Sequence, residues 1–215
     1  MYRALIPVKS LYEAKSRLAT SLTREQRKTL VLDMLYHVIT TLLASNVLAG
    51  VTVVSPDPLV LEKAELWGAY AQVEEEQGHN PALHAAAVRE LAMGVTALLT
   101  ISADLPLLHP RDVQGMIEQS RLYDVVLAPS WEGTGTNALL VRPPLALPYL
   151  FGPGSLQRYL AEAKKECLSS VLCNSIGMAL DVDTIDDVEM FQCYETEGKA
   201  MYASLPSASC AENDL

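Results

Sequence analysis

The chain has 215 residues, of which 50% are hydrophobic and 20% are charged, and its formal net charge at pH 7 is −10. An acidic chain is a poor general nucleic-acid binder, because affinity for the phosphate backbone needs a basic face. No apolar run approaches the roughly 20 residues of a membrane span, and no secretory signal core follows Arg3. The four cysteines have no C-x-x-C spacing, which is typical of reduced thiols. We therefore expect a cytoplasmic protein that binds neither nucleic acid nor membranes.

The first predicted strand, residues 4–8, leads into a basic loop. The first 28 residues hold 7 of the 16 basic residues and only two acidic ones, so this segment carries about +5 in an acidic chain. Lys9, Lys15 and Arg17 follow the strand closely, where open α/β sheets bind ligands, and their pattern favours a phosphate site. The alternative is a solvated loop. Neither a G-x-G-x-x-G fingerprint nor a P-loop motif is present, so dinucleotide-binding and P-loop proteins are not indicated.

Helices and strands alternate after this loop. Thr23 and Gln26 have the spacing of a capping box and predict a long helix that ends near Asn46. The expected elements that follow are a strand at 51–55, a helix at 59–67, a strand at 70–74, a loop through Gly78 and Asn80, and a helix at 82–93.

A continuous apolar run at 96–102 is typical of a central parallel strand that is covered on both faces. Asp104 comes directly after this run, and Pro106 directs the chain away from it. An aspartate at the carboxyl end of a strand can bind a Mg²⁺ ion that bridges substrate phosphates. It can equally cap the turn before the next helix.

The second half of the chain departs from the regular alternation. We expect a helix at 110–120, strands at 124–128, 138–141 and 170–173, a helix from 155 to about 166, and a last helix at 184–195. The order of elements predicts an α/β fold with a mostly parallel sheet, helices on both faces and a later antiparallel part. We expect one domain over residues 1–195 and a polar, poorly ordered tail at 196–215.

Two further features are candidates for a site. Asp181 and Asp183 lie about 7 Å apart on one face if their segment is extended, where they could share a metal with Asp104. The alternative is that Asp183 or Thr184 only caps the last helix. The loops at 133–137 and 152–155 are rich in glycine, which lets backbone N–H groups approach an anion. Ser155 adds a hydroxyl at a helix start. Plain turns are the alternative for both loops.

Taken together, these motifs resemble those of a known family. The matching stretches are Pro7-Val8-Lys9, Ala14 to Leu18, Gly78 to Leu83, Ser102 to Leu107, Gly135-Thr136-Asn137, Phe151 to Ser155 and Leu180 to Thr184. In this order they resemble the 2-phospho-L-lactate guanylyltransferases of coenzyme F420 biosynthesis. Those enzymes belong to the nucleotidyltransferase superfamily that also holds molybdenum-cofactor guanylyltransferase.

The resemblance implies a Rossmann-like fold of the nucleotide-diphospho-sugar transferase type. It also implies a reaction in which GTP and 2-phospho-L-lactate give lactyl-diphosphoguanosine and pyrophosphate. The implied roles are GTP binding by Lys9, Lys15, Arg17 and Asn80; Mg²⁺ binding by Asp104, Asp181 and Asp183; catalysis by Lys15 and Asp104; and acceptor binding by Thr136, Gly152 and Ser155.

Three points stay open in the sequence. The acceptor could be phosphoenolpyruvate or another small acid, since phosphoenolpyruvate differs from phospholactate by one unsaturation. A non-catalytic nucleotide-binding regulator is the alternative from another class, although it does not require both Asp104 and Asp183. An exposed strand edge makes a homodimer our expectation for the assembly.

Overall fold

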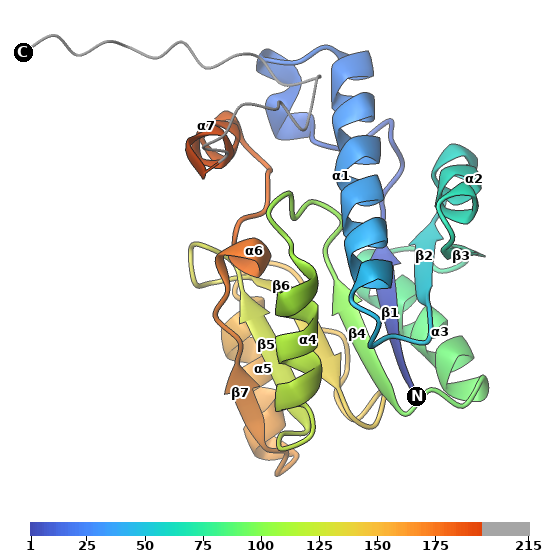
Figure 1. Ribbon diagram of the computed structural model, residues 1–215, viewed down its shortest axis with the longest axis vertical. Helices are drawn as coiled ribbons and strands as arrows, with labels where there is room; N and C mark the ends of the chain where they lie inside the picture. The colour runs from blue at the N-terminus through green and yellow to red at the C-terminus, as the bar shows by residue number, and fades with distance from the viewer. Residues whose placement is uncertain (195–215) are drawn as a thin grey trace, which may run out of the picture.

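A seven-stranded sheet with the order β3-β2-β1-β4-β6-β5-β7 forms the centre of the computed structural model, which describes residues 1–194 (Figure 1). The predicted tail at 196–215 lies outside the described residues. The strands are β1 (Tyr2–Pro7), β2 (Val51–Ser55), β3 (Tyr70–Val73), β4 (Ala97–Ile101), β5 (Val125–Pro129), β6 (Thr136–Val141) and β7 (Ser170–Leu172). The helices are α1 (Arg24–Ala44), α2 (Pro58–Leu66), α3 (His79–Ala92), α4 (Pro110–Gln119), α5 (Ser155–Lys165), α6 (Ile176–Ala179) and α7 (Ile185–Tyr194), with a 3-10 helix η1 (Ser16–Thr20).

The sheet is mostly parallel, as predicted. Strand β1 is parallel to β2 and β4, β2 is parallel to β3, and β5 is parallel to β7. Strand β6 runs antiparallel between β4 and β5, with Leu140 opposite Leu99 on one side and Val126 on the other. The expected antiparallel part is therefore one inserted strand.

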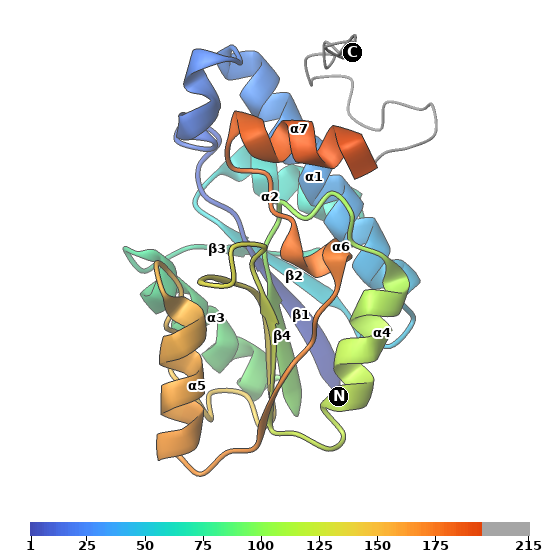
Figure 2. The same ribbon diagram turned by 90° about the vertical axis from the view of Figure 1, so that its left-hand side faces the viewer.

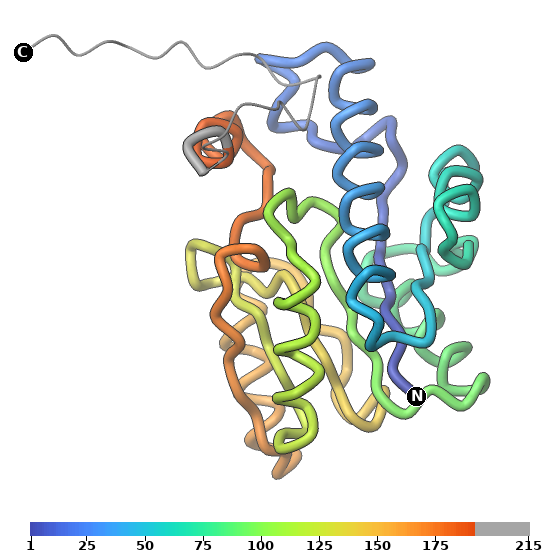
Figure 3. Tube along the Cα trace, in the orientation of Figure 1, coloured from blue at the N-terminus to red at the C-terminus, as the bar shows by residue number. Residues whose placement is uncertain are grey.

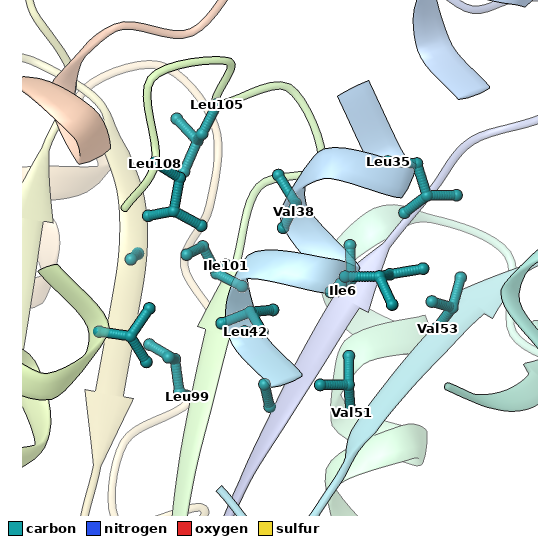
Figure 4. Packing of buried hydrophobic residues seen from close by; sticks show 14 of the residues in the cluster. Ile6, Leu35, Val38, Leu42, Val51, Val53, Leu99, Ile101, Leu105 and Leu108 are labelled. Atoms are coloured by element: carbon teal, nitrogen blue, oxygen red, sulfur yellow. The ribbon is translucent and has the colours of Figure 1, made fainter. Parts of the chain in front are cut away.

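Helices cover both faces of the sheet (Figure 2). Helices α1, α2 and α4 pack on one face, and α3 and α5 pack on the other. Because successive strand residues point to opposite faces, Ile6 joins the cluster under α1, whereas Leu5 joins the cluster under α3. Figure 4 shows Ile6 among Leu35, Val38 and Val53 in the first of these clusters. The aliphatic core agrees with the scarcity of Phe and Trp in the sequence.

The C-terminal part of the described chain returns to the carboxyl ends of β1 and β4 (Figure 3). The backbone N–H of Val182 donates to the carbonyl oxygen of Asp104 over 3.2 Å. Beside it, η1, α1 and α7 share a separate buried cluster made of Leu18, Leu22, Leu30, Met34, Leu180, Val182, Val188 and Phe191. The segment that carries Asp181 and Asp183 is thus held against the loop that carries Asp104.

The structure corrects some expected boundaries. Helix α3 begins at His79, three residues earlier than predicted, so Asn80 lies in its first turn and not in a loop. Pro81 is tolerated there because the first N–H groups of a helix have no partner within it. The short α6 and η1 were not predicted, since neither spans enough residues for a helical pattern. None of the helices described is long and apolar enough to cross a membrane.

Candidate active site

A pocket of about 430 Å³ opens at the carboxyl ends of β1 and β4, where open α/β sheets bind ligands. The loop after β1 supplies one wall and the loop after β4 another. Helix α1 and the start of α3 contribute, as do two residues from distant parts of the chain, Phe151 and Asp183. The charged lining residues are Lys9, Glu13, Lys15, Arg17, Asp104 and Asp183.

Lys15 lies at the centre of the charged cluster. Its Nζ is 2.5 Å from Oδ2 of Asp104 and 2.8 Å from Oδ1 of Asp183, and its side chain is only 7% exposed. The backbone of Lys15 adopts the left-handed conformation, with φ +52°, immediately before η1. A non-glycine residue rarely takes this conformation, so its persistence here indicates that the surroundings constrain it. The structure thus brings three of the predicted site residues into direct contact.

The charges around Lys15 favour its protonated form. Burial opposes this, but the attraction of Asp104 and Asp183 outweighs burial and raises the pKa of Lys15. For Asp183, burial favours a higher pKa, yet Lys15 outweighs it and the pKa is lowered. Burial, followed by the negative charge of Asp104, raises the pKa of Asp181 to about 6. One buried ammonium therefore contacts two carboxylates, and a third carboxylate, Asp181, interacts with both of these, so additional positive charge is stabilised here.

The other two predicted cations are more accessible. Arg17 Nη1 is 3.9 Å from Oδ2 of Asp183, and the Arg17 side chain is 73% exposed. Lys9 is exposed and lines the same pocket. Both side chains can therefore move toward an anionic ligand in the pocket.

Asn137 is a site residue that was quoted in the sequence motif but assigned no role. Its side chain is buried, and Nδ2 lies 2.9 Å from the carbonyl oxygen of Ala179 and 3.0 Å from Oδ1 of Asp181. Its own carbonyl oxygen accepts from the N–H of Ser102 over 2.8 Å. Asn137 on β6 thus fixes Asp181 beside the loop of Asp104. The signal was the Gly-Thr-Asn motif, in which we had singled out only the threonine.

Asn80 is not among the residues that line the pocket. Its Nδ2 donates to the carbonyl oxygen of Phe151 over 3.1 Å, and its Oδ1 accepts from the N–H of Phe151 over 3.0 Å. His79 and Phe151 line the pocket instead, with their rings edge to face at 5.7 Å. Both rings lie within the sequence motifs that carry the family resemblance, but neither residue was assigned a role in the site.

The predicted acceptor residues do not line this pocket either. The hydroxyls of Thr136 and Ser155 are buried and hydrogen-bonded to each other over 3.1 Å, which links β6 to the start of α5. The N–H of Ser155 donates to the carbonyl oxygen of Gly152 over 3.0 Å. Gly152 is exposed and has φ +120°, a conformation that favours glycine. It follows Phe151 directly, so its loop begins at the pocket wall.

The donor atoms at this site fit a hard divalent cation. Asp104, Asp181 and Asp183 offer carboxylate oxygens, which Mg²⁺ prefers. The pKa of Asp181 is raised first by burial and then by the negative charge of Asp104, and a bound cation would oppose the second of these effects. Within residues 1–194, no group of three or more His, Cys, Asp or Glu side chains is already arranged to hold a metal ion. The Lys15 ammonium is the cation that contacts Asp104 and Asp183.

The chain is similar to known proteins along most of its length. The family model described as "Guanylyl transferase CofC like" matches residues 2–204. The phosphoenolpyruvate guanylyltransferase of Rubrobacter xylanophilus is 42% identical over 86% of this chain and 90% of its own. The 2-phospho-L-lactate guanylyltransferase of Methanobrevibacter ruminantium is 31% identical over 86% of this chain and 82% of its own.

Among solved structures, a candidate nucleotide-diphospho-sugar transferase from Desulfovibrio desulfuricans G20 superposes with a TM-score of 0.79. The match covers 94% of this chain and 93% of the other at 15% identity, so it bears on the fold alone. The fold is that of the nucleotide-diphospho-sugar type nucleotidyltransferases, as the sequence resemblance implied. With nearly the whole chain matched by the family model, the protein belongs to the CofC-like guanylyltransferase family.

Proposed function

We propose that the protein transfers GMP from GTP to phosphoenolpyruvate, releasing pyrophosphate, as a step in coenzyme F420 biosynthesis. The observation that carries the proposal is the pocket in which Lys9, Lys15 and Arg17 meet Asp104 and Asp183. Three cations beside paired carboxylates suit a triphosphate, whose transfer needs both positive charge and a fixed orientation. Membership of a guanylyltransferase family disfavours the non-catalytic regulator.

The reaction asks for little covalent chemistry from the protein. A phosphate oxygen of the acceptor bonds to the α-phosphorus of GTP, while the bond from that phosphorus to the bridging oxygen of the β-phosphate breaks. The attacking oxygen is already anionic, so no strong general base is needed. Lys9, Lys15 and Arg17 would stabilise the negative charge on the transferred and leaving phosphates and align the reactants.

We assign Mg²⁺ binding to Asp104 and Asp183, with Asp181 held in place behind them by Asn137. When bound, the ion would neutralise phosphate charge during the transfer. Lys15 contacts both carboxylates and keeps their orientation defined in the free protein. We further propose that the loop at Gly152 contacts the acceptor, while Thr136 and Ser155 support that loop through their mutual hydrogen bond.

The choice of acceptor follows the curated relatives. The relative named for phosphoenolpyruvate is 42% identical, and the one named for 2-phospho-L-lactate is 31% identical. The sequence had favoured 2-phospho-L-lactate, which remains the second candidate because a family member of nearly equal coverage is named for it.

A pyrophosphate-release assay tests the proposal. GTP, ATP, CTP and UTP are each offered with phosphoenolpyruvate or 2-phospho-L-lactate, with Mg²⁺ and with excess EDTA. We expect release with GTP and phosphoenolpyruvate, at least tenfold faster than with any other nucleotide, and none in EDTA. Faster release with 2-phospho-L-lactate would select the second candidate. Release with no pair would contradict both.

Asp104→Asn should lower this release at least 100-fold, because the substitution keeps the shape of the side chain and removes its charge. The matched control is Glu65→Gln, an equivalent change on an exposed residue of α2. The control should keep the rate of the unmodified protein. Similar rates for the two variants would exclude Asp104 from the active site.

A further inference from the structure

Three different elements hold a three-residue segment whose last residue, Phe151, lines the pocket. Tyr149, Leu150 and Phe151 follow one another in the chain, and we call them the strap. The Tyr149 hydroxyl is 2.9 Å from Oγ1 of Thr100 on β4. The Leu150 N–H donates to the hydroxyl of Tyr159 on α5 over 2.8 Å, and Phe151 is bonded to Asn80 on α3. Each residue of the strap is thus tied to a separate part of the fold.

Asn80 makes the most complete of these connections. Its amide binds both the N–H and the carbonyl oxygen of Phe151, so it pairs with the backbone as a neighbouring strand would. One of the two N–H donors and one of the two acceptor lone pairs of the amide are therefore engaged with the protein, which restricts how the side chain could approach a base edge. The Asn80 side chain also lies outside the set of pocket-lining residues, whereas Phe151 belongs to it.

The Phe151 ring is held by contacts with three aromatic rings, in addition to the hydrogen bonds that hold its backbone. It lies edge to face with Tyr159 at 5.4 Å and with His79 at 5.7 Å, and it is stacked with Tyr149 at 6.0 Å. Aromatic contacts of this geometry add to the stability given by burial alone. The ring therefore holds one position in the pocket wall, directly before the glycine-rich loop that begins at Gly152.

We propose that Asn80 is a positioning residue, which acts on substrate binding by holding the strap and not by reading the guanine. This inference rests on the proposed function for its kinetic part only. It assigns to Asn80 a role that differs from the one implied by family resemblance. It also predicts that substitution of Tyr159, which holds the same strap from another helix, changes hydrogen exchange and substrate binding in the same way as substitution of Asn80.

Two variants release the strap from two different helices, α3 and α5. Asn80→Ala removes both bonds to Phe151, and Tyr159→Phe removes only the hydroxyl that accepts from Leu150. Tyr159 is fully buried and does not line the pocket, so its hydroxyl cannot reach the base. The matched control is His84→Ala, an exposed position on the same helix as Asn80.

Hydrogen exchange tests the strap without reference to activity. We expect faster exchange in a peptide covering residues 146–154 for Asn80→Ala and Tyr159→Phe, and no change for His84→Ala. Unchanged exchange in Asn80→Ala would overturn the proposal even if the enzyme were fully active. If the Asn80→Ala protein exchanges faster but the unmodified protein shows no turnover, the proposed function fails while this inference about the strap stands.

Kinetics with GTP and ATP test the role of Asn80. We expect the KM for GTP to rise about tenfold in both variants, with kcat changed less than threefold, since one well-made hydrogen-bonded contact accounts for such a factor. The ratio of kcat/KM for GTP to that for ATP should stay within threefold of the unmodified value. The loss of kcat/KM for GTP in the double variant, expressed as a free energy, should be smaller than the sum of the losses in the two single variants, because both substitutions act on one segment.

A base-reading residue would give a different result. A site that hydrogen-bonds a polar group of its substrate rejects analogues lacking that group by a large factor. If Asn80 reads guanine, Asn80→Ala should reduce the GTP to ATP ratio tenfold or more, while Tyr159→Phe leaves it unchanged. That divergence between the two variants would overturn the proposal.

Discussion

Lys15 is the residue at which the charges of the site meet. Its ammonium group is almost fully buried and contacts Asp104 and Asp183, whereas Arg17 at the rim is largely exposed. An exposed ion pair contributes little to stability, but removing one partner from a buried pair leaves uncompensated charge. Lys15 should therefore contribute more to the stability of the fold than Arg17, even though both are proposed to bind phosphate.

Lys15→Met should lower the free energy of unfolding by about 2–3 kcal/mol, below the full cost for a completely buried pair because Asp183 is half exposed. Arg17→Met should cost less than about 1 kcal/mol. Urea unfolding at pH 7 measures the free energy of unfolding of both variants. Equal losses of this free energy in Lys15→Met and Arg17→Met would show that Lys15 does not compensate the carboxylates in solution.

Asp104→Asn should change the unfolding midpoint less than Lys15→Met does. The variant leaves Lys15 paired with Asp183, and it relieves the repulsion between Asp104 and Asp181. Thermal unfolding monitored by circular dichroism provides the measurement. A larger shift for Asp104→Asn than for Lys15→Met would contradict this balance of charges.

A second buried ion pair holds α3 to the sheet, far from the pocket. Arg3 Nε on β1 lies 2.7 Å from Oε2 of Glu90, and Thr52 on β2 bonds to both side chains. Glu90 is fully buried, and the Arg3 guanidinium also stacks over the Tyr70 ring at 4.4 Å. This network fixes the end of α3 opposite the one that carries His79 and Asn80.

Arg3→Met should destabilise the protein by about 3–5 kcal/mol, because it leaves the Glu90 carboxylate buried without a partner. The double variant with Glu90→Leu should recover most of that loss, since it removes the stranded charge. The midpoint of urea unfolding measures both variants, and pyrophosphate release at 25 °C should change less than threefold. A double variant as unstable as Arg3→Met would show that the cost lies in packing and not in charge.

Local sequence signals predicted most helix starts. Thr23 and Gln26 make both bonds of the capping box, and Pro110 stands at the first helical position of α4, as predicted, whereas α2 begins at Pro58, one residue before its predicted start. The start of α3 was placed too late because Gly78 and Pro81 look like a loop when tertiary contacts are unknown. The Arg3–Glu90 pair and the Asn80–Phe151 bonds join residues far apart in the chain, so no local pattern reports them.

At the scale of the whole molecule, the alternation of helices and strands indicated the parallel sheet, since such crossovers favour parallel neighbours. It could not place β6 between β4 and β5, which depends on long-range pairing of Leu140 with Leu99 and Val126. The same pairing positions Asn137 against Asp181. The single domain, the cytoplasmic location and the homodimer stay predictions, and light scattering in solution measures the last.

The measurement that tests the central claim most directly follows the label from [α-³²P]GTP during incubation with phosphoenolpyruvate and Mg²⁺. We predict that the label enters a new compound in which a diphosphate joins guanosine to the three-carbon acid, with one pyrophosphate released per labelled product. Formation should require the acceptor and should be lost in Asp104→Asn. Label that remains in GTP, or appears only as GMP or GDP, with both phosphoenolpyruvate and 2-phospho-L-lactate would contradict guanylyl transfer to either acid.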